Sequence, residues 1–186
     1  MGLFYKLSAA MGFVVMTSNY LVQFPINYFG LKEILTYGAF SYPITFLITD
    51  LANRAYGKFV ARKIVYIGFI IGVLLSLFIS TNFNDIISIR IAVGSGLAFF
   101  VAQNLDIKIF DKLRKKSWYI APLISSVFAS IIDTFLFFSI AFYSTGVPWL
   151  SLAFGDLTVK LFIALSLLIP FRLLLSSIRD VSEIKR

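Results

Sequence analysis

The sequence predicts an all-α integral membrane protein: a single domain over residues 1–186 with six transmembrane helices. Hydrophobic residues make up 59% of the chain, whereas soluble domains average roughly 45–50%. Mean hydropathy is +0.90, and charged residues are only 14% of the chain. The apolar residues form long unbroken runs, which favour helices over the alternating strands of a membrane barrel.

Six apolar runs approach the roughly 20 residues that a helix needs to cross a bilayer core. The expected spans are 8–29, 37–54, 63–80, 88–108, 118–142 and 157–177. The first span is expected to be a retained helix and not a signal peptide, because it continues into "SNYLVQFP" without a small-residue cleavage site. The connection 143–156 is amphipathic and is expected to lie at the outer interface.

The basic residues predict the orientation of the chain. With six spans, 14 of the 17 Lys and Arg residues fall on one side, namely Lys6, Arg54, Lys58, Arg62, Lys63, Lys108, Lys112, Arg114, Lys115, Lys116, Arg172, Arg179, Lys185 and Arg186. The other side receives Lys32, Arg90 and Lys160. Cytoplasmic loops carry an excess of basic residues, so both termini are expected in the cytoplasm. The net charge of +8 therefore reflects topology and does not indicate nucleic-acid binding.

The composition disfavours catalysis. The chain has no Cys and no His, which removes disulfides, thiolate metal sites, the thiol nucleophile and the usual general base. It has no GxxxxGK[ST] motif, so the chain itself is expected to hydrolyse no ATP. We therefore expect no catalytic residue, no metal site and no cofactor. An intramembrane serine enzyme would have only Asp133 as a plausible base, and a purely structural protein would not need three intramembrane acids.

Three acids stand inside apolar spans, where a charged side chain costs roughly 2.5–3.5 kcal/mol on insertion scales. Asp133, in "SIIDTFLFF", is expected near the centre of the bilayer, and Asp50 and Asp106 closer to the cytoplasmic end. Such acids persist where they face a bundle interior, a water-filled cavity or a partner. The sequence therefore predicts a polar cavity between the helices.

Each acid has polar or aromatic neighbours at helical spacing. The candidate substrate-binding residues are Asn19, Gln23, Tyr42, Phe46, Asp50, Arg54, Gln103, Asp106, Ser130, Asp133 and Lys160. Further aromatic faces come from Phe40, Phe99 and Phe137. A carboxylate can accept two parallel N–H bonds, carboxamides can pair with a ring carbonyl or ring N–H, and aromatic faces can stack. This chemistry suits a small flat heterocycle, and the residues alone predict a transporter for a small polar molecule.

Simpler roles remain open for several of these residues. Asp50 and Arg54 can form a local ion pair at a helix end, and Asp106 can begin the cytoplasmic loop. Asn19 and Gln23 can serve as hydrogen bonds between helices. Lys160, four residues after Asp156, can extend its ammonium toward the outer interface.

Four stretches resemble the bacterial queuosine-precursor transporters, also described as vitamin uptake transporters. They are "TSNYLVQFP", "GAFSYPITFLITDLANRAYG", "AQNLDIKIFDKLR" and "WYIAPLISSVFASIIDTFLFFSIAF". The resemblance runs from about Ser18 to Pro170. The matching positions are Ser18, Asn19, Gln23, Pro25, Thr49, Asp50, Arg54, Gly57, Gln103, Asp106 and Asp133. One departure is Ser130, where relatives often carry Asn or Gln; its shorter side chain suggests a water-mediated contact.

The resemblance implies an inner-membrane importer of the 7-deazaguanine queuosine precursors preQ0 and preQ1. It also implies an all-helical fold akin to the substrate-binding components of energy-coupling-factor transporters. The expected partners are the small-molecule substrate and the lipid bilayer, and a homo-oligomer is compatible with the sequence. Under this resemblance Asp133, or failing that Asp50, accepts the N1–H and exocyclic amine of the ligand. Gln103, Gln23 or Asn19 then lies near the ring carbonyl and pyrrole N–H. Asp50 with Arg54 can instead close the cytoplasmic side as a gate.

The mode of energy coupling stays open at this point. A stand-alone carrier can work by facilitated diffusion or by proton movement on an intramembrane Asp. The alternative is a vitamin- or nucleobase-binding component that needs a separate ATPase module. Such components commonly meet their partner through a small-residue pair on the first helix, for which this chain offers only Ser8 with Gly12. The pair Gly68 and Gly72 is expected to be a close-packing face.

Overall fold

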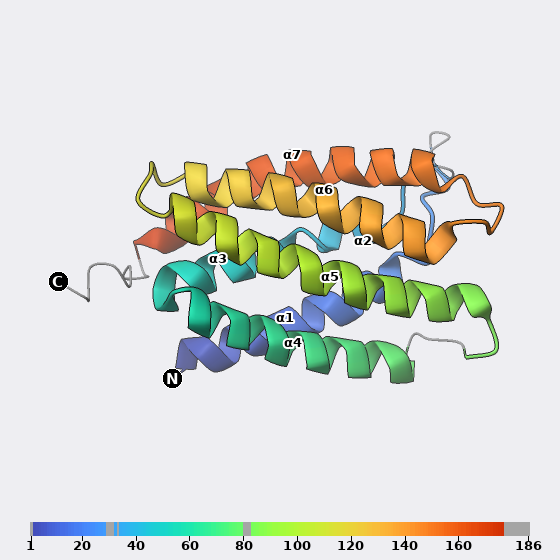
Figure 1. Ribbon diagram of the computed structural model, residues 1–186, viewed down its shortest axis with the longest axis horizontal. Coiled ribbons are helices and arrows are strands. Elements are labelled where there is room, and N and C mark those ends of the chain that lie inside the picture. The colour runs from blue at the N-terminus through green and yellow to red at the C-terminus, as the bar shows by residue number, and fades with distance from the viewer. Residues whose placement is uncertain (1, 29–31, 33, 80–82, 177–186) are drawn as a thin grey trace.

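The computed structural model describes residues 2–28, 32, 34–79 and 83–176, and they form an elongated bundle of helices (Figure 1). The basic residues Arg179, Lys185 and Arg186 lie outside this described part. The helices are α1 (Gly2–Leu21), α2 (Gly38–Ser41), α3 (Ile44–Tyr56), α4 (Lys58–Ile79), α5 (Ile86–Leu113), α6 (Ile120–Phe142) and α7 (Trp149–Leu175). The extended pairing among the described residues is one isolated bridge between Pro25 and Thr36. The expectation of an all-α protein is therefore confirmed.

Several helix bounds differ from the expected spans. Helix α1 ends at Leu21, well before residue 29, because the chain folds into tight turns and then reaches Pro25, which has no N–H to continue a helix. The expected second span is divided into α2 and α3 at Tyr42 and Pro43. Helix α7 begins at Trp149 instead of residue 157, so the second half of the expected interfacial connection is helical.

Local sequence explains where helices begin and end. The side chain of Asp85 accepts a hydrogen bond from the backbone N–H of Ile87 (3.0 Å), which caps the start of α5. Gly57 ends α3 with φ of +80°, a conformation that favours glycine, and its N–H bonds the carbonyl of Asn53. Pro122 stands in the first turn of α6, where a missing N–H costs nothing.

Helices α1 and α4 approach each other closely at glycines. A Cβ added to Gly68 would lie 2.4 Å from the Cβ of Met11, and one added to Gly72 would lie 2.7 Å from Val15. A Cβ on Gly12 would lie 2.9 Å from Ile71 and 3.3 Å from the carbonyl oxygen of Gly68. The small residues therefore let the two backbones approach, as predicted for Gly68 and Gly72.

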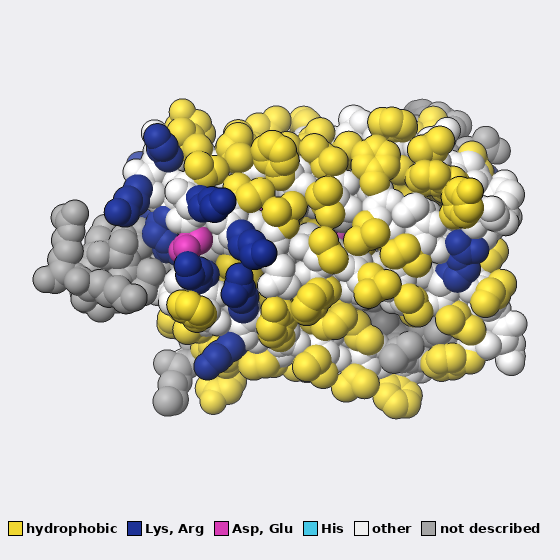
Figure 2. All heavy atoms as spheres, viewed as in Figure 1, with side chains coloured by type: hydrophobic (Ala, Val, Ile, Leu, Met, Phe, Trp, Pro, Cys, Tyr) yellow, Lys and Arg dark blue, Asp and Glu magenta, His cyan; other side chains and the backbone are white. Residues whose placement is uncertain are grey.

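The other extensive contacts join α5 to α6 and α6 to α7. The surface of the bundle is largely apolar, and Figure 2 shows hydrophobic side chains over most of the visible face. Some large rings point outward, such as Phe78, which is 86% exposed. Soluble monomers rarely expose apolar patches of this extent. Within the described residues, three helices, α5, α6 and α7, are long and apolar enough to cross a membrane; the full set of six transmembrane helices stays a prediction.

Most of the basic side chains visible in Figure 2 gather at one end of the bundle, the end where α1 begins and α7 ends (Figure 1). Arg114 lies at this end and donates to the backbone carbonyl of Asn53 (2.8 Å), while Lys58 pairs with Asp111 (3.2 Å). The cytoplasmic placement of this end stays a prediction. We refer to this end as the basic end.

The close contact of α1 with α4 makes a stability prediction. We expect Gly68→Ala to lower the midpoint of thermal unfolding in detergent, because the new Cβ overlaps a Met11 atom that is next to the backbone and cannot easily move. Overpacking of this kind costs about 1–3 kcal/mol. The matched control is Gly96→Ala on α5, whose Cβ would meet the Phe69 ring at an ordinary 3.6 Å. Equal midpoints for the two variants would contradict the close approach.

Candidate functional site

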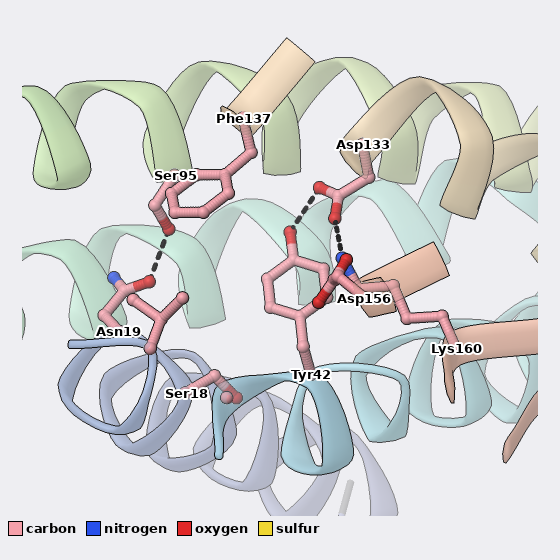
Figure 3. A pocket seen from close by; sticks show the side chains of 10 residues that line it. Ser18, Asn19, Tyr42, Ser95, Asp133, Phe137, Asp156 and Lys160 are labelled. Carbon is pink, nitrogen blue, oxygen red and sulfur yellow. Dashed lines mark hydrogen bonds and ion pairs between the residues drawn. The ribbon is translucent and has the colours of Figure 1, made fainter. Parts of the chain in front are cut away.

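A pocket lies between five helices in the half of the bundle away from the basic end (Figure 3). Its cavity volume, counted for water-sized occupants, is about 30 Å³. Its lining residues are Ser18, Asn19, Val22, Gly38, Tyr42, Ser95, Asp133, Phe137, Asp156 and Lys160. We call this the outer pocket. It collects side chains from the last turn of α1, from α2 and its junction with α3, and from α5, α6 and α7.

Helical spacing explains why the charged groups of the outer pocket meet. Asp156 and Lys160 stand four residues apart on α7 and share a face, as do Asp133 and Phe137 on α6. Because α6 and α7 pack along much of their length, these two faces meet inside the bundle. Tyr42 enters from the interruption between α2 and α3.

The ammonium of Lys160 is the centre of this group. Its Nζ lies 2.9 Å from Oδ2 of Asp133, 2.6 Å from Oδ2 of Asp156 and 3.1 Å from Oγ1 of Thr134. It also lies 4.8 Å from the centre of the Tyr42 ring. All three charged residues are almost completely buried, at 3% exposure for Lys160, 2% for Asp133 and 4% for Asp156. Lys160 therefore does not extend to the outer interface.

Each of the two acids also accepts a hydrogen bond from a hydroxyl group. The Tyr42 hydroxyl donates to Oδ1 of Asp133 at 2.7 Å, and Thr134 donates to Oδ2 of Asp156 at 2.8 Å. Figure 3 shows Tyr42, Asp133, Asp156 and Lys160 converging in this way. A carboxylate offers about four lone-pair positions, so Asp133 keeps acceptor capacity after these bonds.

The opposite side of the outer pocket carries neutral polar groups. Ser95 of α5 donates to the side-chain oxygen of Asn19 on α1, and the hydroxyls of Ser18 and Ser41 lie 2.8 Å apart. The Phe137 ring stands between this side and the charged side (Figure 3). The chain between α1 and α2 covers α7 beside Asp156, since a Cβ on Gly155 would lie 2.0 Å from the carbonyl oxygen of Ile34.

A second polar layer follows along α3 toward the basic end. Thr49 donates to the side-chain oxygen of Gln103, and the amide of Gln103 donates to Oγ1 of Thr45 at 3.0 Å. Thr45 in turn donates to the carbonyl of Tyr42 at 2.8 Å. Gln103 is thus bonded between α3 and α5, outside the outer pocket.

Asp50 and Asp106 form a third layer near the basic end. They lie beside each other, and Asp50 accepts from Ser125 (3.3 Å) and Ser126 (3.5 Å) of α6. Neither oxygen of Asp106 has a hydrogen-bond partner among the described residues, although Asp50 and Ser125 are its polar neighbours. A smaller cavity, of about 10 Å³ counted for water-sized occupants, lies between α3, α6 and α7; it reaches this layer and is lined in part by Asp50 and Ser126. We call it the inner cavity.

The structure thus separates the predicted site residues into groups. The outer pocket contains Asn19, Tyr42, Asp133 and Lys160, while Phe46 and Asp50 line the inner cavity. Gln23 is exposed on the turn after α1, where its amide donates to the carbonyl of Asn19 (3.2 Å). The Ser130 hydroxyl is buried one turn from Asp133 without a hydrogen-bond partner among the described residues. Arg54 lies one turn beyond Asp50 toward the basic end, and the expected ion pair between these two stays a prediction.

Sequence reasoning omitted Asp156, Ser18, Ser95, Val22 and Gly38 from the candidate residues. For Asp156 a signal existed, since its four-residue spacing from Lys160 predicts a shared helix face. Ser95 is a small polar residue in an apolar helix and carries no such signal. Of the aromatic residues expected at the cavity, Phe137 lines the outer pocket, whereas Phe40 is 48% exposed.

The chain matches a known protein family over most of its length. The family model described as "Putative vitamin uptake transporter" matches residues 36–175. The chain belongs to this family. That match includes α2 to α7 and therefore every charged residue of the outer pocket.

Three curated relatives match over most of their length. A "Probable queuosine precursor transporter" of Haemophilus influenzae is 36% identical, with 85% of this chain and 80% of the relative covered. The "Queuosine precursor transporter" of Escherichia coli is 34% identical, with 92% and 87% covered. A "Probable queuosine precursor transporter" of Bacillus subtilis is 30% identical, with 88% and 83% covered. No solved structure gives a significant match, so the fold likeness to energy-coupling-factor components stays a prediction.

The buried ion pairs of Lys160 predict a large effect on stability. We expect Lys160→Met to lower the free energy of unfolding by about 3–5 kcal/mol, because it leaves two buried carboxylates without their cation. The control is Lys58→Met, which removes an exposed pair with Asp111 and should cost less than about 1 kcal/mol. Thermal unfolding of both variants in the same detergent measures the difference. Similar midpoints would show that Lys160 is not held by these carboxylates.

Proposed function

We propose that the chain is an inner-membrane importer of 7-deazaguanine queuosine precursors. The observation that carries the proposal is the outer pocket, in which a buried carboxylate, a carboxamide and aromatic rings line a small cavity between five helices. Small-molecule sites have this character: mostly apolar walls with a few placed polar groups. The family and the names of the three relatives supply the substrate class.

In the proposed pose the ligand edge with N1–H and the exocyclic amine faces Asp133. Asp133 has unused acceptor positions, and the Tyr42 and Lys160 contacts hold its carboxylate in one orientation. The Phe137 ring offers a stacking face. Of the three carboxamides considered for the ring carbonyl and pyrrole N–H, Asn19 is the one that lines this pocket, since Gln103 is bonded to Thr45 and Gln23 is exposed.

The position of the outer pocket supports uptake from the outside. It lies in the half of the bundle away from the basic end, and basic ends of membrane proteins face the cytoplasm. Between the pocket and the basic end stand the layers at Gln103 and at Asp50. They extend over about 12 Å of helical rise, counted from Tyr42 to Asp50 at roughly 1.5 Å per residue. We propose that these layers close the inner half in the present conformation.

One observation supports a stand-alone carrier over a component that needs an ATPase module. The small-residue pair expected to meet such a partner, Ser8 and Gly12, packs inside the bundle against α4. A Cβ on Gly68 would lie 3.1 Å from the carbonyl oxygen of Ser8, and Ser8 is 4% exposed. This face of α1 is therefore already used by the protein itself.

An uptake experiment tests the function. The chain is expressed in cells that cannot make 7-deazaguanines, lack their own precursor importer and contain no energy-coupling ATPase module. We expect nanomolar preQ0 or preQ1 in the medium to restore queuosine in tRNA, measured by mass spectrometry. An absence of queuosine with the protein confirmed in the membrane would contradict a self-sufficient importer. Restoration only when an ATPase module is added would favour the partner-dependent alternative.

The proposed pose predicts a difference between the buried acids. We expect Asp133→Asn to weaken preQ0 binding to the purified protein at least about tenfold, because an amide presents its own N–H groups to the ligand donors and loses charge-assisted hydrogen bonds. The same change at Asp50 neutralises another buried acid outside the outer pocket and should retain binding. Isothermal titration measures both affinities. Loss at Asp50→Asn with normal binding by Asp133→Asn would move the site to the inner cavity.

A further inference from the structure

The surroundings of the Lys160 ammonium match a primary alkylammonium group in number and kind. An –NH₃⁺ group has three donors, and three oxygens surround Nζ, from Asp133 (2.9 Å), Asp156 (2.6 Å) and Thr134 (3.1 Å). The Tyr42 ring covers a further side at 4.8 Å, which suits a cation above an aromatic face. These four residues, which we call the ammonium cage, come from α6, α7 and the junction after α2.

The ammonium cage opens onto ligand space. Tyr42, Asp133, Asp156 and Lys160 are all lining residues of the outer pocket, so the cage and the ammonium inside it border that pocket. A buried ion pair that served only to hold α6 and α7 together would not need to form the wall of a cavity. In Figure 3 the Lys160 side chain reaches the cage along the pocket wall from α7.

Charge gives a second reason to expect a cationic ligand. Counted in their ionised forms, Asp133 and Asp156 contribute two negative charges and Lys160 one positive charge. The other polar residues that line the outer pocket, Ser18, Asn19, Tyr42 and Ser95, are neutral. An uncompensated charge in a buried site is costly, and a second cation would offset it. The outer pocket is thus formally anionic before a ligand enters.

We propose that the ammonium cage is a binding subsite for a primary alkylammonium group of the ligand, which Lys160 fills while the outer pocket is empty. A ligand ammonium takes the place of the Lys160 ammonium, or shares the two carboxylates with it, and so cancels the remaining negative charge. This subsite rests on the proposed function, in which the ring binds in the outer pocket, and it makes Asp156 a specificity-determining residue. The pocket then favours the aminomethyl precursor preQ1, which carries an ammonium, over the neutral nitrile preQ0.

The first test needs no queuosine precursor. Lys160→Ala removes three methylene groups and the ammonium, a fragment equal in size to n-propylammonium. We expect millimolar n-propylammonium chloride to raise the thermal unfolding midpoint of purified Lys160→Ala by several degrees more than that of the wild-type protein. Tetramethylammonium chloride at the same concentration is the control, because it carries the charge but no N–H donors. Equal midpoint shifts with the two salts, or equal shifts for the variant and the wild-type protein, would contradict the proposal that the cage binds an alkylammonium group.

The second test uses ligand selectivity and does not depend on the folding of Lys160→Ala. We expect wild-type protein to bind preQ1 more tightly than preQ0. Asp156→Asn should lower the preference for preQ1 over preQ0 at least about tenfold, because the loss of one charge-assisted hydrogen bond changes an affinity by about that factor. The new amide keeps a side-chain oxygen at this position, so Thr134 retains an acceptor. An unchanged ratio would overturn the role of Asp156.

The two tests separate the inference from the function on which it rests. If the wild-type protein binds neither precursor but n-propylammonium selectively stabilises Lys160→Ala, the ammonium cage stands and the proposed substrate fails. If both precursors bind with a ratio that Asp156→Asn leaves unchanged, the proposed function stands and the selectivity role is wrong.

Discussion

The buried ammonium of Lys160 is the constraint on which the arrangement of this bundle depends. Apolar helix surfaces do not by themselves specify which faces meet in a lipid environment, because lipid tails are as apolar as leucine. Lys160 must find anions inside the protein, and it finds Asp156 on its own helix and Asp133 on α6. This requirement sets the rotation of α7 against α6. Through the Tyr42 hydroxyl on Asp133 it also sets the position of the junction between α2 and α3.

Polar contacts continue in layers along α3, and each layer joins a different set of helices. Tyr42 connects to α6 and α7, Thr45 and Thr49 connect to α5 through Gln103, and Asp50 connects to α6 through Ser125 and Ser126. At the basic end the amide of Asn53 donates to the carbonyl of Ile107 (3.1 Å). The short helix α3 and Tyr42 just before it therefore link α5, α6 and α7 through buried polar contacts.

The all-α class, the gathering of basic residues at one end and the burial of the three acids could be predicted from the sequence, because hydropathy and charge are local properties of the chain. The grouping of the acids could not. Asp50, Asp106 and Asp133 look alike in sequence, yet Asp50 lies beside Asp106 while Asp133 pairs with Lys160. Such pairings depend on how the helices rotate and pack, which no spacing within one helix reveals. The interruption at Tyr42 did carry a signal in the sequence, because Pro43 lacks the N–H that a continuous helix needs, but the apolar run on both sides led us to expect one span.

The glycine contact between α1 and α4 has a consequence for how the outer pocket can change shape. The glycines of each helix pack directly against side-chain atoms close to the backbone of the other helix, which leaves little room for α1 to shift against α4. Helix α1 packs far less against α5, where the hydrogen bond between Asn19 and Ser95 spans the pocket. A wider pocket would therefore have to break the Asn19–Ser95 bond, whereas α4 stays joined to α5 by further contacts such as the stacked rings of Phe69 and Phe99.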